Sequence, residues 1–266
     1  MQKKSQILLN KINIFAYMIR IAIIGGGNIA HHLIRAFLPV PQVEIVELYA
    51  RKPEQLSEFN TLPIAHSLNE MKAVDVAIVA VSDDAISIVS QQLNNARLVV
   101  HTSGSADLQS LENSQRKGVF YLLQSFSKAK EVDFSDVPFC LEAPNPDDFA
   151  LLKTLAECIG SKIYAINSEQ RRYLHVAAVF VNNFTNHLYK IGYDICNRYA
   201  VPFEVLHPLI GETAAKIQNL APESAQTGPA KRNDEKTIQK HLNLLTQEQQ
   251  EIYQLLTDSI RNGKKL

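Results

Sequence analysis

The sequence predicts a mostly parallel, doubly wound α/β sheet that precedes an all-α C-terminal domain. Three observations support this fold class: short β-branched runs alternate with helical segments to about residue 166, glycines follow the first run, and the period after Ser168 is helical. Such alternation is typical of βαβ units, whose strands are parallel. We therefore expect an N-terminal extension over residues 1–17, an α/β domain over 18–167 and a helical domain over 168–266.

The expected strands of the first domain are short and mostly apolar, as buried parallel strands are. They cover residues 19–24, 43–49, 62–65, 74–81, 97–101, 119–123, 138–142 and 162–166. Between them we expect helices over residues 29–38, 53–59, 82–93 and 146–159. Pro39 ends the first of these helices, and Ser82 followed by two acidic residues is a good start for the third.

The second domain is expected to contain helices alone. Residues 169–200 contain no proline and predict one long helix, and Pro202 begins another that reaches about residue 219. A polar loop over 221–232 follows, and Asn233 or Asp234 caps the next helix. Thr246 with Gln249 forms a capping box for the last helix, which ends at residues 262–263.

Composition restricts the class of protein. The chain of 266 residues is 46% hydrophobic and 20% charged, as soluble globular proteins are. Lys plus Arg and Asp plus Glu number 27 each, so no overall basic field favours nucleic acid or an anionic membrane as a partner. The three cysteines show neither metal nor disulfide spacing, which favours a reducing cytoplasm and no metal site. Because Met18 directly precedes the first strand, we interpret residues 1–17 as an upstream extension.

A glycine loop follows the first expected strand and opens the first expected helix. Gly25, Gly27 and Ala30 match the dinucleotide-binding fingerprint of a Rossmann domain, with Asn28 and Ile29 between them. The first glycine permits the tight turn, the second lets the pyrophosphate approach the backbone, and Ala30 permits close packing of helix on strand. The alternative is a glycine turn without a ligand.

The end of the second strand indicates which dinucleotide binds. Arg51 and Lys52 follow a small residue, Ala50, and two cations suit the 2′-phosphate of NADP. NAD is the less favoured alternative, because Glu47 could serve the ribose hydroxyls if the strand ended earlier.

Two further strand ends are candidate cofactor contacts. Val81 and Ser82 follow the fourth expected strand, and Ser103 and Gly104 follow the fifth. Ligands of open α/β sheets bind at the carboxyl ends of strands beside the topological switch point. The alternative is that both segments only cap the helices that follow.

The long helix has an apolar face and a polar face. The apolar face is made of Ala177, Phe180, Val181, Phe184, Leu188, Ile191 and Ile195. The opposite face carries His175 and Asn182, with Asn183 nearby. It either faces solvent or orients a small-molecule substrate, with His175 donating or accepting a proton. The apolar face is either domain core or the interface of a homodimer formed through the helical domain.

The loop over residues 227–234 offers a second candidate for substrate binding. Thr227 could hold a carboxylate at the following helix N-terminus, and Arg232 could pair with an acid of the substrate or with Asp234. The alternative is an ordinary loop between helices.

Taken together, six segments resemble an uncharacterised bacterial family with a Rossmann-like NADP-binding domain and a C-terminal helical domain of unknown function. They are residues 25–30, 101–105, 123–126, 175–184, 207–210 and 227–234. The architecture is more distantly similar to pyrroline-5-carboxylate reductase and the 6-phosphogluconate dehydrogenase superfamily. These relatives imply NADP-linked reduction of a C=N or C=O bond and dimerisation through the helical domain.

One departure from that superfamily concerns the catalytic lysine of its hydroxyacid dehydrogenases, which lies four residues before an asparagine. Here Val179 precedes Asn183 and Ala178 precedes Asn182 at that spacing. An NADP-dependent oxidoreductase acting on a small imine or oxo acid is therefore the leading interpretation, with His175 and Asn183 at the reacting end. The alternatives are a non-catalytic NADP-binding sensor or docking protein, and a hydroxyacid dehydrogenase that uses His175 as its base.

Overall fold

The computed structural model describes residues 18–112 and 116–263. The chain divides into two compact units, Met1–Asn182 and Asn183–Leu266, which are described separately below. The expected extension over residues 1–17 lies outside the described residues. No helix formed by the described residues is long and apolar enough to span a bilayer.

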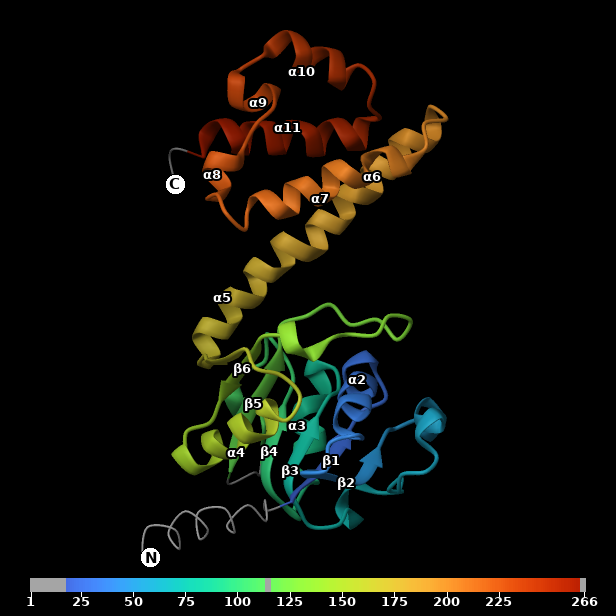
Figure 1. The fold of residues 1–266 in the computed structure, drawn as a ribbon, viewed down its shortest axis with the longest axis vertical. Coiled ribbons are helices and arrows are strands. Elements are labelled where there is room, and N and C mark those ends of the chain that lie inside the picture. The colour runs from blue at the N-terminus through green and yellow to red at the C-terminus, as the bar shows by residue number, and fades with distance from the viewer. Residues whose placement is uncertain (1–17, 113–115, 264–266) are drawn as a thin grey trace, which may run out of the picture. The chain divides into compact units, whose positions relative to one another are not determined.

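The first unit is built on one seven-stranded sheet with the order β2-β1-β3-β4-β5-β6-β7 (Figure 1). The strands are β1 (Ile19–Ile24), β2 (Val43–Tyr49), β3 (Val74–Val79), β4 (Ala96–His101), β5 (Lys117–Leu122), β6 (Phe139–Glu142) and β7 (Ile163–Ala165). The β5–β6 pair is antiparallel and every other pair is parallel. The expected fold class, a mostly parallel doubly wound sheet followed by helices, is confirmed.

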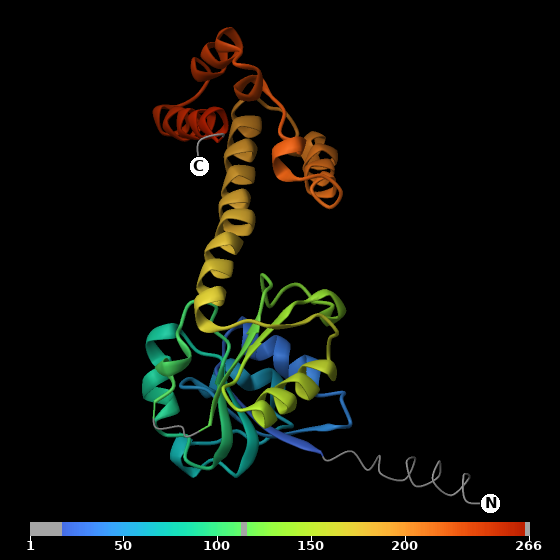
Figure 2. The same cartoon turned by 90° about the vertical axis from the view of Figure 1, so that its left-hand side faces the viewer.

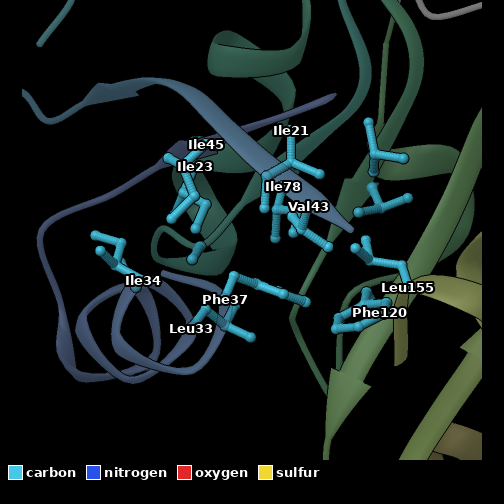
Figure 3. Packing of buried hydrophobic residues seen from close by; sticks show 14 of the residues in the cluster. Ile21, Ile23, Leu33, Ile34, Phe37, Val43, Ile45, Ile78, Phe120 and Leu155 are labelled. Atoms are coloured by element: carbon cyan, nitrogen blue, oxygen red, sulfur yellow. The ribbon is translucent and has the colours of Figure 1, made fainter. Parts of the chain in front are cut away.

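Helices cover both faces of this sheet. On one face, α2 (Asn28–Phe37) and α4 (Pro146–Glu157) pack against apolar strand residues, together with the 3-10 helix η1 (Pro53–Phe59). Figure 3 shows Leu33, Ile34 and Phe37 of α2 directed at the isoleucines of β1 and β3. The short α3 (Ile86–Ser90) covers the other face, opposite α2 and α4 (Figure 2).

Two elements of the first unit differ from the prediction. Residues 62–65 form no strand but a single bridge between Leu48 and Ile64. Pro63 lacks an N–H, so this edge segment cannot extend a ladder. The expected helix over 82–93 is a 3-10 turn, η3 (Asp83–Ala85), followed by α3, and turns replace it after Ser90. The Ser90 hydroxyl bonds the carbonyl of Ser87, a local bond that competes with helix continuation.

The long helix is present but is not uniform. A capping box of Asn167 and Gln170 starts α5 (Ser168–Ala178), a π-helical segment covers Val179–Phe184, and α6 (Thr185–Arg198) continues from it. A π segment widens the helix by one residue per turn and is frequent at functional sites. The periodicity over 169–200 thus predicted the helix but not the widened turn.

The second unit continues with short helices. They are η7 (Phe203–Leu206), α7 (His207–Lys216), α8 (Pro222–Ala225), α9 (Pro229–Arg232), α10 (Glu235–Leu242) and α11 (Gln247–Asn262). The capping box of Thr246 and Gln249 is confirmed. Asp234, not Asn233, caps α10, because Asn233 adopts a left-handed conformation. The expected loop over 221–232 contains α8 and α9, each one turn long and each started by a proline.

A buried arginine attaches α5 to the sheet. Arg171 has an exposed fraction of 0% and forms an ion pair with Glu142, the last residue of β6. Its Nη2 donates to the carbonyl of Ala106 at 2.6 Å and to Oγ of Ser168 at 3.1 Å. Ser168 in turn donates to the Glu142 carboxylate at 2.8 Å. One side chain therefore joins β6, the start of α5 and the segment after β4.

We predict that Arg171→Met lowers the free energy of unfolding by about 3 kcal/mol or more, because Glu142 would keep its charge without a cationic partner. Arg172→Met is the matched control, since Arg172 is exposed, and should change this free energy by roughly 0.5 kcal/mol or less. Urea unfolding of both variants measures the difference, and equal effects would contradict the anchoring role of Arg171.

Candidate functional site

A cavity of about 750 Å³ lies at the carboxyl ends of β1, β2 and β3. The parallel register places Ile24 of β1 beside Tyr49 of β2 and Val79 of β3, so the three strands end together. Sequence-predicted residues that line the cavity are Gly25, Gly27, Asn28, Ile29, Arg51, Val81 and Ser82. The cavity also borders residues for which the sequence predicted no role in a site: Gln55, Leu68, Ala85, Val89, Gln92, Gln124 and Phe126.

The glycine loop leaves β1 through a turn that requires glycine. Gly25 has a φ of +138°, and a methyl group there would overlap the carbonyl oxygen of Ala80. Its N–H donates to the carbonyl of Tyr49 at 2.7 Å. The turn is therefore fixed against the ends of β2 and β3.

Gly27 differs from Gly25, since a methyl group on it would meet nothing within 4 Å. It is the N-cap of α2, in an extended conformation, and forms no side-chain cap hydrogen bond. The first turn of α2 holds no acidic residue. The first N–H groups of this helix therefore face open space with a partial positive charge, which suits a phosphate. Ala30 lies beneath them, fully buried, where its small side chain permits close packing of helix and strand.

The N-terminal turn of α2 is tied to the segment after β5. The Asn28 side chain donates to the carbonyl of Phe126 at 2.9 Å, and His32 Nε2 lies 2.9 Å from the carbonyl of Ser127. Asn28 thus uses its amide to hold the cavity wall that Gln124 and Phe126 form. This contact spans 98 residues, so no local pattern could predict it.

The two cations after β2 are placed differently. Both side chains are exposed, but Arg51 lines the cavity and Lys52 lies outside its lining. Glu47, the acidic residue considered for an NAD ribose, is 8% exposed and interacts with Lys72. Its carboxylate accepts from the Lys72 N–H at 2.9 Å and pairs with Lys72 Nζ at 3.3 Å. The geometry therefore leaves Arg51 as the charged group at this end of the cavity.

Gln55 also reaches the cavity, from η1. A methyl group on Gly26 would overlap its Oε1 and stand 2.8 Å from its Cβ, so the Gln55 side chain packs directly on the glycine loop. Val81 and Ser82 form the facing wall, and Ser82 makes no side-chain cap bond to η3. Ser82 is nevertheless the N-cap residue of η3, in an extended backbone conformation, so the capping alternative for Ser82 stays open.

A second cluster lies at the carboxyl ends of β4 and β5. Tyr121 of β5 and His175 of α5 are hydrogen-bonded, with 3.2 Å between the phenol oxygen and Nδ1. Gly104 is packed against both: a methyl group there would stand 2.5 Å from Nδ1 of His175 and 2.8 Å from Cζ of Tyr121. Burial raises the pKa of Tyr121 to about 12. The structure thus brings together His175 and Gly104, two predicted residues, with Tyr121, which was not predicted.

The turn before Gly104 is held by buried polar contacts. His101 is fully buried, and its Nδ1 accepts the Ser103 N–H at 3.2 Å. Burial, with the Arg171 charge nearby, lowers the pKa of His101 to about 4, so its ring is neutral at neutral pH. The Ser103 hydroxyl accepts from the N–H groups of Ser105 and Ala106, which favours its alternative reading as a turn cap.

The remaining candidates lie around and beyond the unit boundary. Asn182 and Asn183 are exposed in the π segment, and Thr227 and Arg232 are exposed in the second unit. A cavity of about 500 Å³ in that unit is bordered by Ala230, Lys231, Asn233 and Arg261, among others, but not by Thr227 or Arg232. The substrate roles of these four residues stay predictions.

Two family models match the chain. Residues 20–104 match a family described as NADP oxidoreductase, coenzyme F420-dependent. Residues 137–260 match a domain of unknown function, DUF2520. No protein with a curated function matches the chain.

Several solved structures are similar over most of the chain. A candidate NADP oxidoreductase from Bacteroides fragilis is 38% identical with a TM-score of 0.85, and the match covers 93% of this chain and 99% of that one. An imine reductase from Myxococcus stipitatus in complex with NADP+ is 14% identical, with a TM-score of 0.61 and coverage of 91% and 92%. The 1-pyrroline-5-carboxylate reductase of Streptococcus pyogenes is 16% identical, with a TM-score of 0.58 and coverage of 92% and 98%.

The two more distant matches show a shared fold and no more. The Bacteroides fragilis match, together with the two family models, confirms the resemblance that the sequence motifs indicated. The chain therefore belongs to the family in which an NADP-binding domain of the NADP oxidoreductase type precedes a C-terminal DUF2520 domain.

Proposed function

We propose that this protein is an NADPH-dependent reductase that acts on a C=N or C=O bond of a small metabolite. The observation that carries the proposal is the uncapped N-terminus of α2, where Gly27 leaves open space at the carboxyl end of β1. A helix N-terminus of this kind binds the pyrophosphate of dinucleotides. The NADP complex of the imine reductase, which shares the fold, supports the same cofactor.

The residues of the cavity suit the parts of NADPH. The N–H groups from Gly27 to Ile29 would hold the pyrophosphate, and Arg51 would hold the 2′-phosphate as a charge-assisted, bidentate partner. Leu68, Val81 and Val89 would enclose the adenine between apolar side chains. The cofactor supplies a hydride when bound, and the protein positions it.

The reacting end belongs at the β4 and β5 side of the sheet. A dinucleotide crosses the switch point between β2-β1 and β3-β4, so its two ends lie over opposite halves of the sheet. With Arg51 at the β2 end, the nicotinamide would lie toward Gly104, Tyr121 and His175. His175, half-buried, would make the hydrogen bond to the reacting group of the substrate. Asn182, Asn183, Thr227 and Arg232 remain proposed substrate contacts, supported by sequence alone.

The second unit exposes many large apolar side chains, which supports a homodimer. They include Leu188, Tyr189, Tyr193, Tyr199, Val201, Val205, Leu209, Ile217, Leu220, Leu244, Leu255 and Leu256. Monomeric proteins seldom expose so many, and a second copy of the same unit would bury them.

If the protein is a homodimer, analytical ultracentrifugation should give a molecular mass of about twice the chain mass of 29.8 kDa. Leu255→Glu, at a side chain that is 70% exposed, should weaken self-association because a charge would be buried in the interface. A monomeric mass for the unaltered protein at micromolar concentration would contradict the proposal.

The two glycines provide a prediction that separates structure from binding. Gly25→Ala should lower the free energy of unfolding by roughly 3 kcal/mol, because of its positive φ and the overlap with Ala80. Gly27→Ala should leave stability nearly unchanged but weaken NADPH binding at least tenfold, since its methyl group would occupy the space meant for the pyrophosphate. Thermal unfolding of both variants measures their stability, and nucleotide titration measures their affinity for NADPH. Tight NADPH binding by Gly27→Ala would be evidence against a pyrophosphate site at the N-terminus of α2.

Arg51→Ala should weaken NADPH binding on the order of tenfold to a hundredfold, with little effect on NADH, because the lost partner is the 2′-phosphate. Lys52→Ala is the matched control and should change the NADPH dissociation constant less than threefold. Titration by nucleotide fluorescence gives these constants.

Turnover is then tested by NADPH oxidation with cyclic imines and small oxo acids. Absence of NADPH binding by the unaltered protein would overturn the proposed function.

A further inference from the structure

We propose that Tyr121 fixes the tautomer of His175, so that the ring presents Nε2–H as a neutral hydrogen-bond donor to an oxygen of the substrate. The ligand this donor takes is a carbonyl or carboxylate oxygen, as in an oxo acid. The inference rests on the proposed function and narrows its substrate class. Tyr121 is a positioning residue in this account, because it acts through His175.

Both residues are held by rigid elements. Tyr121 is the penultimate residue of β5, paired with Cys140 of β6. His175 lies one helical turn beyond Arg171, whose buried contacts fix the start of α5. The two rings meet edge to face with centroids 6.2 Å apart. Gly104 packs so closely on Nδ1 that no side chain fits between the pair and the turn after β4. The surrounding contacts therefore hold the two side chains against each other.

The direction of the hydrogen bond follows from burial. Tyr121 is 7% exposed, and its raised pKa keeps the phenol protonated throughout the neutral range. A buried O–H is costly without an acceptor. Within the described residues 18–112 and 116–263, the partner of the Tyr121 hydroxyl is Nδ1 of His175. If Nδ1 carried the proton, it would donate to the phenol oxygen and leave the phenol O–H unsatisfied.

The phenol therefore donates to Nδ1, and the neutral ring carries its proton on Nε2. Such a nitrogen donates a hydrogen bond and cannot accept one. A protonated imine has no lone pair to receive that bond, whereas a carbonyl or carboxylate oxygen does. The same tautomer makes His175 unsuitable as the base of a hydroxyacid dehydrogenase, because its acceptor nitrogen is occupied by Tyr121. A neutral histidine that donates to a carbonyl is a known device for polarising that bond.

The tautomer can be read without substrate or nucleotide. Nitrogen NMR of protein labelled with ¹⁵N-histidine, at a pH where the ring is neutral, distinguishes protonated from unprotonated ring nitrogens, and His175→Gln assigns the signals. We expect an unprotonated Nδ1 in the unaltered protein and a mixture of tautomers in Tyr121→Phe. Tyr164→Phe, at a half-exposed tyrosine of β7, should leave the ring signals unchanged. Gly104→Ala should reproduce the effect of Tyr121→Phe, since its methyl group would separate the pair.

The ligand class is tested with oxamate, a stable analogue of an oxo acid, added to the complex with NADPH. Oxamate should shift the Nε2–H signal of His175, and Tyr121→Phe should weaken oxamate binding on the order of tenfold while NADPH affinity is retained. A protonated Nδ1 in the unaltered protein, identical ring signals in Tyr121→Phe, or no response of the ring to oxamate would each overturn the inference. Failure of the proposed function is separate, because it appears as absence of NADPH binding.

Discussion

The turn at Gly25 is the constraint on which the candidate site depends. The chain leaves β1 between the ends of β2 and β3, with its N–H bonded to Tyr49 and its α-carbon against the carbonyl of Ala80. No side chain fits at that position, so glycine alone lets α2 begin directly above the strand. The N-terminus of α2 then points along the carboxyl edge of the sheet, where the cavity is. The turn at Gly25 therefore places the start of α2 at the cavity.

The second constraint is the buried Arg171, which fixes the start of α5 to β6 and to the segment after β4. Because His175 follows one turn later, this attachment also decides where the imidazole meets Tyr121. The two clusters, one at β1–β3 and one at β4–β5, are thus positioned by different interactions along the same edge of one sheet. We propose that one dinucleotide contacts both clusters, because both lie at the carboxyl ends of neighbouring strands.

Local sequence patterns predicted those parts of the fold that depend on residues close together in sequence. The glycine turn between β1 and α2, the strands other than the expected one over 62–65, and the capping box at Thr246 each depend on residues close together in sequence, and each was predicted correctly. The bridge at Ile64, the shortened α3 and the π segment were missed, because competing local bonds and tertiary packing determine them. Among site residues, Gln55, Phe126 and Tyr121 were missed because contacts with residues distant in sequence place them there. Glu47 shows the converse: the structure pairs it with Lys72, whereas the sequence had offered it for an NAD ribose.

We propose that one dinucleotide extends along the carboxyl edge from Arg51 to the Tyr121–His175 pair. A crystal structure of the protein grown with NADP+ would test this arrangement. We expect the pyrophosphate on the N–H groups that follow Gly27, the 2′-phosphate against Arg51, and the nicotinamide beside Gly104. A nucleotide bound elsewhere, or one whose nicotinamide points away from β4 and β5, would contradict it.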